Sequence, residues 1–190
     1  MASDKTTALA FHCLASLALF VGTIPAANWM IGNVGTKCVP DGPCLIPVAP
    51  GLMAPSGVIL AGSALVLRDL VQRRFGLGVS VAAIMFGALL SAAVAPPALV
   101  VASAIAFLLS ELADTVVYTP LARRRFIAAV VASSVVGLFV DSIIFLWLAF
   151  GSLEFLAGQV VGKAWAVLLA IPIMAWMRNR EAASGFSRKR

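Results

Sequence analysis

The chain has 190 residues, of which 62% are hydrophobic and only 12% are charged, and its mean hydropathy is +1.03. A soluble domain carries roughly 25% charged residues, so the composition excludes an ordinary soluble protein. The net charge of +6 does not by itself indicate a nucleic-acid partner, because the basic residues of a membrane protein must first be sorted by loop. We therefore expect an all-α integral membrane protein, with a single domain over residues 1–190.

Six apolar windows are long enough to cross a bilayer, because about 20 helical residues span its ~30 Å hydrocarbon layer. They cover residues 8–30, 50–71, 77–95, 98–119, 126–150 and 156–177. If the N-terminus is cytoplasmic, 12 of the 14 basic residues fall on the inner side, and only Lys37 and Lys163 do not. Positive loops face the cytoplasm, so we expect six transmembrane helices with both termini inside. The arginines, Arg68 included, are then expected at lipid head groups.

The loop after the first window contains two cysteines, Cys38 and Cys44, in the segment KCVPDGPC. The Pro-Asp-Gly sequence between them is typical of a tight turn. An oxidising exterior would allow a disulfide here, and two free thiols are the alternative. Two cysteines without further ligands nearby do not make a zinc site, so no metal is expected.

Residues 45–57, LIPVAPGLMAPSG, are apolar but rich in proline and glycine, which excludes a regular helix over most of the segment. Ser56 is expected to cap the helix that follows. Counting back from Arg68 at ~1.5 Å per residue puts Ser56 roughly 18 Å inside the layer, so we expect a broken, partly re-entrant segment. Irregular backbone at that depth must be buried in protein or line a cavity; an outer loop packed on helix ends is the alternative.

The fourth window, LVVASAIAFLLSELADTVVYTP, contains two carboxylates, Glu111 and Asp114. Helical spacing puts them on one side of the helix with Tyr118, and Ser110 lies a turn earlier than Asp114. A carboxylate is costly inside a bilayer, so one polar face on an apolar span predicts a site rather than a plain anchor.

The last two windows add polar residues at matching depth. Ser134 and Asp141 share a face of the fifth, and Gln159 and Lys163 lie four residues apart in the sixth. Counted from the outer ends of their helices, Asp141 and Lys163 both lie roughly 12 to 14 Å inside the outer boundary. We therefore expect them to face each other, either as a structural ion pair or as part of a binding site.

The three intramembrane carboxylates, Glu111, Asp114 and Asp141, exceed what Lys163 alone can neutralise. At least one is therefore expected to be protonated, hydrated or available to a ligand's donors. A carboxylate pairs well with two adjacent N–H donors, as in guanidinium groups and the edge of guanine-like rings. The chain has one histidine and no HExxH, GxSxG or P-loop motif, so we expect a transporter without a cofactor rather than an enzyme.

From residue 102 onward the chain resembles the vitamin-uptake-transporter (VUT) family, whose bacterial members include queuosine precursor transporters. The resemblance is carried by ASAIAFLLSELADTVVYTPLARR, ASSVVGLFVDSIIFLWLAFG and QVVGKAW with Pro172 following. It implies a six-helix carrier in a bacterial plasma (inner) membrane for a 7-deazaguanine such as 7-cyano-7-deazaguanine, its aminomethyl relative or queuine. The positions that match the family pattern are Ser110, Asp114, Asp141 and Lys163, whereas Glu111 stands where many members have Gln and Ser134 where Asn is expected.

The expected substrate-binding set is Ser56, Ser110, Glu111, Asp114, Ser134, Asp141, Gln159 and Lys163. Two modes of transport remain open. The first is a stand-alone secondary carrier, with proton linkage through Glu111 or Asp114. The second is the substrate-binding membrane subunit of an ATP-driven importer, which would need energy-coupling partner subunits. In both, the expected partners are a purine-like small molecule and the lipid bilayer, without nucleic acid, and a homodimer is also left open.

Overall fold

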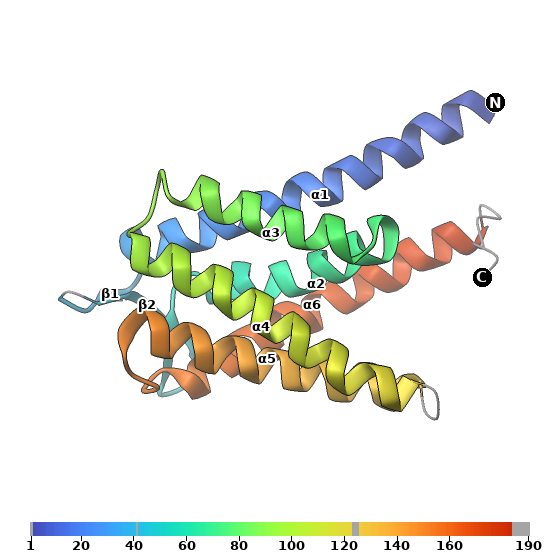
Figure 1. The fold of residues 1–190 in the computed structure, drawn as a ribbon. Helices are drawn as coiled ribbons and strands as arrows, with labels where there is room; N and C mark the ends of the chain where they lie inside the picture. The colour runs from blue at the N-terminus through green and yellow to red at the C-terminus, as the bar shows by residue number, and fades with distance from the viewer. Residues whose placement is uncertain (1, 41, 123–125, 184–190) are drawn as a thin grey trace.

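The computed structural model describes residues 2–40, 42–122 and 126–183. Within these residues it contains six helices and one small antiparallel sheet (Figure 1). The helices are α1 (Ala2–Asn33), α2 (Val58–Phe75), α3 (Leu77–Ser91), α4 (Pro97–Ala122), α5 (Phe126–Phe150) and α6 (Leu156–Ala183). The strands are β1 (Lys37–Cys38), β2 (Cys44–Ala49) and β3 (Leu52–Pro55). Each apolar window corresponds to one helix, so the expected mainly helical fold is confirmed.

Successive helices run in opposite directions, so their ends gather at two sides of the bundle (Figure 1). The start of α1 and the end of α6 lie at one side, which we call the terminal end, with the turn between α2 and α3 and the start of α5. The sheet lies at the opposite side, the sheet end. Arg73 and Arg74 close α2, and Arg178 and Arg180 lie near the end of α6. Basic residues are thus concentrated at the terminal end, and which end faces the cytoplasm stays a prediction.

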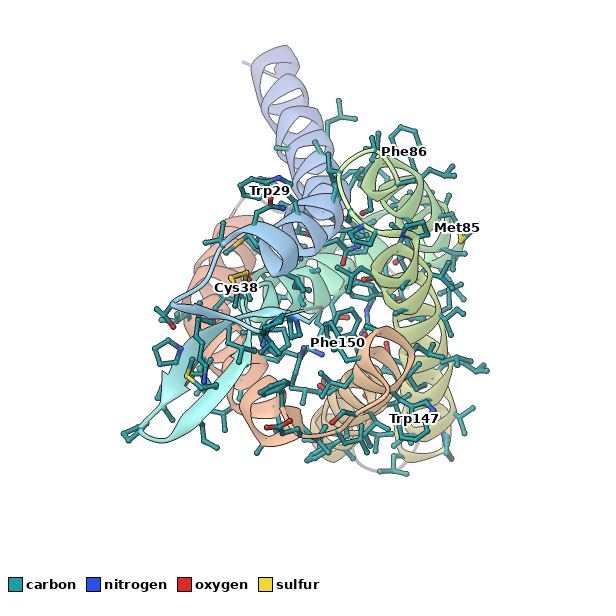
Figure 2. The ribbon with its side chains drawn as sticks, turned by 90° about the vertical axis from the view of Figure 1, so that its left-hand side faces the viewer. Trp29, Cys38, Met85, Phe86, Trp147 and Phe150 are labelled. Carbon is teal, nitrogen blue, oxygen red and sulfur yellow. A yellow bond between two sulfur atoms is a disulfide. The ribbon has the colours of Figure 1, made fainter. Side chains whose placement is uncertain are left out.

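Large apolar side chains cover the outside of the bundle. Figure 2 shows Met85, Phe86 and Trp147 pointing away from it, and all three are exposed. Among the described residues, three helical stretches are long and apolar enough to cross a membrane: Leu14–Asn33, Pro97–Val117 and Ala132–Phe150. Leu77–Ser91 and Leu156–Leu169 are shorter apolar helices. Such a surface suits lipid rather than water, and the chain is a multi-pass membrane protein.

The proline-rich segment before α2 forms short strands within an otherwise mainly helical protein, and its partial entry into the membrane stays a prediction. Strands β2 and β3 pair as an antiparallel hairpin around Gly51, whose φ of +74° lies in the left-handed region that glycine adopts easily. The expectation that this segment is not helical is confirmed. Proline prevents a helix here, and the hairpin instead lets the two strands satisfy each other's backbone groups.

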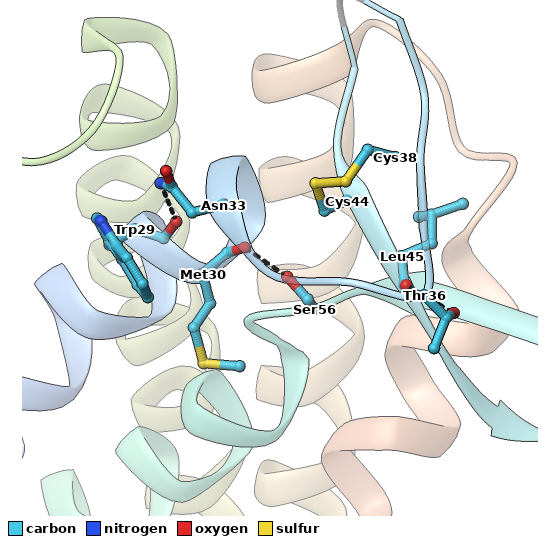
Figure 3. The surroundings of a disulfide bond; sticks show 8 residues. All are labelled: Trp29, Met30, Asn33, Thr36, Cys38, Cys44, Leu45 and Ser56. Carbon is cyan, nitrogen blue, oxygen red and sulfur yellow. Dashed lines mark hydrogen bonds between the residues drawn. A yellow bond between two sulfur atoms is a disulfide. The ribbon is translucent and has the colours of Figure 1, made fainter.

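The disulfide left open by the sequence is present between Cys38 and Cys44, directly opposite residues of β1 and β2 (Figure 3). It holds the short edge strand β1 to the hairpin. The hairpin in turn contacts α6: a Cβ at Gly158 would lie 2.0 Å from the Met53 carbonyl oxygen, so only glycine fits there. The indole N–H of Trp165 also donates a hydrogen bond of 3.2 Å to the Val48 carbonyl.

Ser56 does not cap α2, contrary to expectation. The cap position of α2 is Gly57, and no side chain bonds there. The hydroxyl of Ser56 instead donates a 2.7 Å hydrogen bond to the Met30 carbonyl near the end of α1 (Figure 3). Its backbone N–H donates to the Cys44 carbonyl at 2.9 Å. Fully buried Ser56 therefore joins the hairpin to α1.

Two apolar clusters hold the helices together. The first joins the four helices α1, α2, α3 and α4 and contains Phe20, Ile24, Ala64, Leu65, Val71, Ala83, Ile84 and Phe107. The second joins α1, α4 and α5 and contains Ile31, Leu99, Ala102, Ala106, Phe145 and Leu146. Residues of both clusters line the pocket described next, so the packed core sets the positions of its walls.

Candidate functional site

A pocket lies between α1, α2, α4, α5 and α6, in the half of the bundle nearer the sheet end. About 420 Å³ of space not filled by atoms lies within it, a figure that includes open space at its mouth. Its walls are mainly aliphatic, with the aromatic rings of Phe107 and Phe145. The polar lining residues are Thr23, Asn28, Ser103, Asp141, Gln159 and Lys163.

An ion pair joins α5 and α6 in the wall of this pocket. The Lys163 ammonium lies 2.5 Å from the Asp141 carboxylate, and these side chains are 1% and 5% exposed. Lys163 also donates to the Ser142 hydroxyl at 2.9 Å, and that hydroxyl donates onward to the Leu138 carbonyl. The prediction that Asp141 and Lys163 face each other is confirmed, and both line the pocket.

Two buried amides line the same pocket. Asn28 is 2% exposed, and its Oδ1 accepts a 2.7 Å hydrogen bond from the Ser103 hydroxyl. Its Nδ2 has no hydrogen-bond partner among the described residues. Gln159 is also 2% exposed, and its Oε1 likewise has no hydrogen-bond partner among the described residues. These atoms are available to a bound molecule.

A second ion pair lies one helical turn beyond the pocket, toward the terminal end. A guanidinium nitrogen of Arg68 lies 2.9 Å from the Glu111 carboxylate, and a second nitrogen lies 2.9 Å from Asp69. Arg68 follows the lining residue Ala64 by four positions, and Glu111 follows Phe107 by four, so each lies about 6 Å further along its helix.

The burial of Arg68 corrects its expected position among lipid head groups. Its residue exposure is only 5%, as is that of Glu111. An unpaired carboxylate in an apolar bundle is costly, and the long arginine side chain reaches inward to compensate Glu111. Lys163 is therefore not the only cation available to the buried carboxylates.

Comparison with known proteins bears on the part of the chain that contains α4, α5 and most of α6. Residues 92–177 match the family model described as "Putative vitamin uptake transporter". This segment belongs to the vitamin uptake transporter family. No curated protein and no solved structure matches the chain.

The segment matched to the vitamin uptake transporters supplies both members of the first ion pair and Glu111 of the second. The resemblance noted in the sequence is thereby confirmed. Asn28 and Arg68 come from the chain before the match. The chain is thus a membrane protein of which residues 92–177 match a transporter family.

Three of the eight expected site residues line the pocket: Asp141, Gln159 and Lys163. The other five do not line it. Ser56 lies in the link between β3 and α2. Glu111 lies one helical turn beyond the end of the pocket that is nearer the terminal end, which we call the pocket floor.

The remaining three expected residues lie along α4 and α5. The Ser110 hydroxyl donates to the Phe107 carbonyl of its own helix at 2.9 Å. Asp114 is partly buried and faces Gly137 of α5. Ser134 is exposed, whereas its neighbour Ser133 is buried. Ser134 therefore lies on an outward part of α5.

Asn28, Ser103 and Arg68 belong to the polar arrangement but were not among the expected site residues. Asn28 could have been predicted from the sequence, because an amide side chain in a long apolar window is unusual. Ser103 was harder to predict, since serine is common in membrane helices and does not by itself indicate a site. Arg68 was misassigned because a basic residue near a helix end fits the positive-inside pattern equally well.

Proposed function

We propose that the chain imports a queuosine precursor, a 7-deazaguanine such as 7-cyano-7-deazaguanine or queuine, as a stand-alone secondary carrier. The observation that carries this proposal is the pocket, in which a buried ion pair, two amides and two phenylalanine rings meet among apolar walls. Few, well-placed polar groups in an apolar cavity are characteristic of small-molecule sites. The resemblance of the C-terminal half supplies the substrate class.

The aromatic and polar parts of the pocket suit a flat heterocycle. Phe107 and Phe145 are 5% and 7% exposed and lie on neighbouring helices α4 and α5. Aromatic rings stack against a planar ring with a favourable contribution beyond area burial. The polar lining residues then select among rings of similar shape by their edges.

We place the sheet end outside the cell. Disulfides persist in oxidising compartments, and the Cys38–Cys44 bond lies at that end. The arginines that close α2 and α6 lie at the terminal end, where the positive-inside rule expects the cytoplasm. The pocket, nearer the sheet end, would then receive its substrate from the exterior.

The Arg68–Glu111 pair is proposed as the inner barrier. It lies between α2 and α4, one turn from the pocket floor on the cytoplasmic side of that arrangement. A substrate leaving toward the cytoplasm must pass this level, so the pair must separate or shift during transport. Proton uptake by Glu111 would weaken it and supplies a route to coupling.

The test is uptake of radiolabelled 7-cyano-7-deazaguanine by purified protein in liposomes without ATP. We expect saturable uptake by the wild-type chain and none by Asp141→Asn. Asn33→Leu serves as control, because Asn33 is exposed at the end of α1 and bonds only the Trp29 carbonyl among the described contacts. Binding without ATP-free uptake, together with a co-purifying ATPase, would favour the importer-subunit alternative. If the protein neither binds nor takes up any deazaguanine, the proposed substrate is refuted.

A further inference from the structure

The two pocket amides use only part of their hydrogen-bonding capacity. Each amide has a C=O acceptor and an NH₂ donor group. Ser103 occupies the carbonyl oxygen of Asn28 and leaves Nδ2 as the unpaired atom. Gln159 leaves its carbonyl oxygen, Oε1, unpaired. The pocket therefore offers one unused donor from α1 and one unused acceptor from α6.

Unused polar atoms at this degree of burial call for a partner. Both residues are 2% exposed, and an unsatisfied buried amide is costly in an apolar environment. Native proteins pair nearly all such groups with other protein groups, ordered water or a ligand. Both amides also line one pocket, so one molecule can reach both.

The charged groups of the pocket are already matched to each other. Asp141 and Lys163 are the only charged side chains among the described residues that line it. Lys163 donates to the Asp141 carboxylate and to the Ser142 hydroxyl, so both charges are compensated inside the protein. A ligand with a net charge would enter without a counter-charge. The pocket therefore favours an uncharged molecule, which among the proposed substrates is 7-cyano-7-deazaguanine rather than queuine with its cationic secondary amine.

We infer that Asn28 and Gln159 bind an uncharged cyclic amide, with Asn28 Nδ2 donating to the ligand's carbonyl and Gln159 Oε1 accepting from its ring N–H. This inference rests on the proposed function and specifies which edge of the ring is recognised. It assigns that recognition to two neutral amides rather than to the membrane carboxylates, whose partners within the protein are Lys163 and Arg68.

The experiment measures the affinity of full-length protein in lipid nanodiscs for 7-cyano-7-deazaguanine and two analogues. One analogue lacks the six-membered ring's carbonyl oxygen, and the other carries a methyl group on the adjacent nitrogen. We expect each analogue to bind wild-type protein roughly tenfold more weakly, since each leaves one buried amide atom unpaired.

The matching protein changes are Asn28→Leu and Gln159→Leu, and each should also weaken binding of the parent compound roughly tenfold. Combining Asn28→Leu with the carbonyl-free analogue should add no further loss, and likewise Gln159→Leu with the methylated analogue. The control Asn33→Leu should bind like the wild type. If a variant does not fold, the two analogues on wild-type protein still decide the question.

Unchanged affinity in both folded variants, or equal binding of all three compounds, would overturn the inference. If no deazaguanine binds the wild type, the proposed substrate is wrong, and the inference is tested separately with two neutral cyclic amides, uracil and 2-pyridone, and with nicotinate. Binding of either neutral amide that falls in Asn28→Leu or Gln159→Leu would support it. Binding of the nicotinate anion alone, or of none of the three, would refute it.

Discussion

The two buried ion pairs of this bundle differ in how completely they are enclosed. Asp141 and Lys163 pair with each other, and both are almost without exposure. Arg68 instead divides its guanidinium between buried Glu111 and Asp69, whose side chain is 39% exposed. The first pair is closed off within the wall of the pocket, whereas the second has a connection to the surface. This difference suits the first to a fixed binding wall and the second to a contact that opens and closes.

The largest effect is expected from Asp141→Asn, which leaves the buried Lys163 ammonium without its counter-charge. Removal of one partner from a buried ion pair destabilises a protein by about 3–5 kcal/mol. Uptake should be abolished, and thermal unfolding in nanodiscs should shift clearly downward. The double variant Asp141→Leu with Lys163→Met should recover stability but not uptake. If Asp141→Asn kept wild-type stability and uptake, the Asp141–Lys163 pair would not be a fixed binding wall, and the contrast with the Arg68–Glu111 pair would be wrong.

Glu111→Gln is expected to have a smaller effect on stability, because Arg68 retains its contact with Asp69. We expect a loss of about 1–3 kcal/mol, the range for a broken buried polar contact. Substrate binding should persist, while the rate of uptake and its dependence on a proton gradient change. The exchange Arg68→Glu with Glu111→Arg should restore part of the rate. Loss of substrate binding in Glu111→Gln, or a rate of uptake equal to that of the wild type, would contradict an inner barrier.

Removal of the disulfide by Cys38→Ser with Cys44→Ser should lower stability by about 2 kcal/mol, as expected for a short cross-linked loop. The same cysteines show which ion pair lies nearer the exterior. In a Cys13→Ala background, a membrane-impermeant reductant and thiol label should modify Cys38 and Cys44 in intact cells. Modification only after permeabilisation would reverse the proposed orientation, and with it the assignment of Arg68–Glu111 as the inner pair.

The smallest effect is expected from Asp114→Asn. Asp114 is partly buried, does not line the pocket and faces Gly137 of α5. We expect a stability change of about 1 kcal/mol or less, because Asp114 is only partly buried although its charge lies near the Arg68–Glu111 pair, and largely retained binding of the deazaguanine probe. Complete loss of binding in folded Asp114→Asn would mean that the site extends along α4 beyond the pocket.

The sequence predicted the helices and the first ion pair well because both depend on local relations. The window 126–150 coincides with α5, since an uninterrupted apolar stretch between charged ends leaves little freedom. Asp141 and Lys163 lie on helices joined by a short turn, so counting residues from that turn fixes their relative height. Depth alone was sufficient to pair them.

Contacts between helices distant in sequence could not be predicted in the same way. The Arg68–Glu111 pair and the Asn28–Ser103 hydrogen bond depend on how α2 and α1 are rotated toward α4. A single sequence does not specify that rotation when small residues are found on several faces. The hairpin was missed for a different reason: its prolines exclude helix but do not reveal pairing between β2 and β3.

The link between the hairpin and the first two helices has a practical consequence. Ser56 is bonded to the end of α1, and Gly57 lies so close to Ala27 that a Cβ would come within 2.4 Å of its carbonyl oxygen. Ala27 immediately precedes Asn28, so the hairpin, the end of α1 and the start of α2 form one mechanical unit. With the sheet end outside, a nanobody that clamps β2 and β3 would hold Asn28 in place and arrest the carrier without entering its pocket.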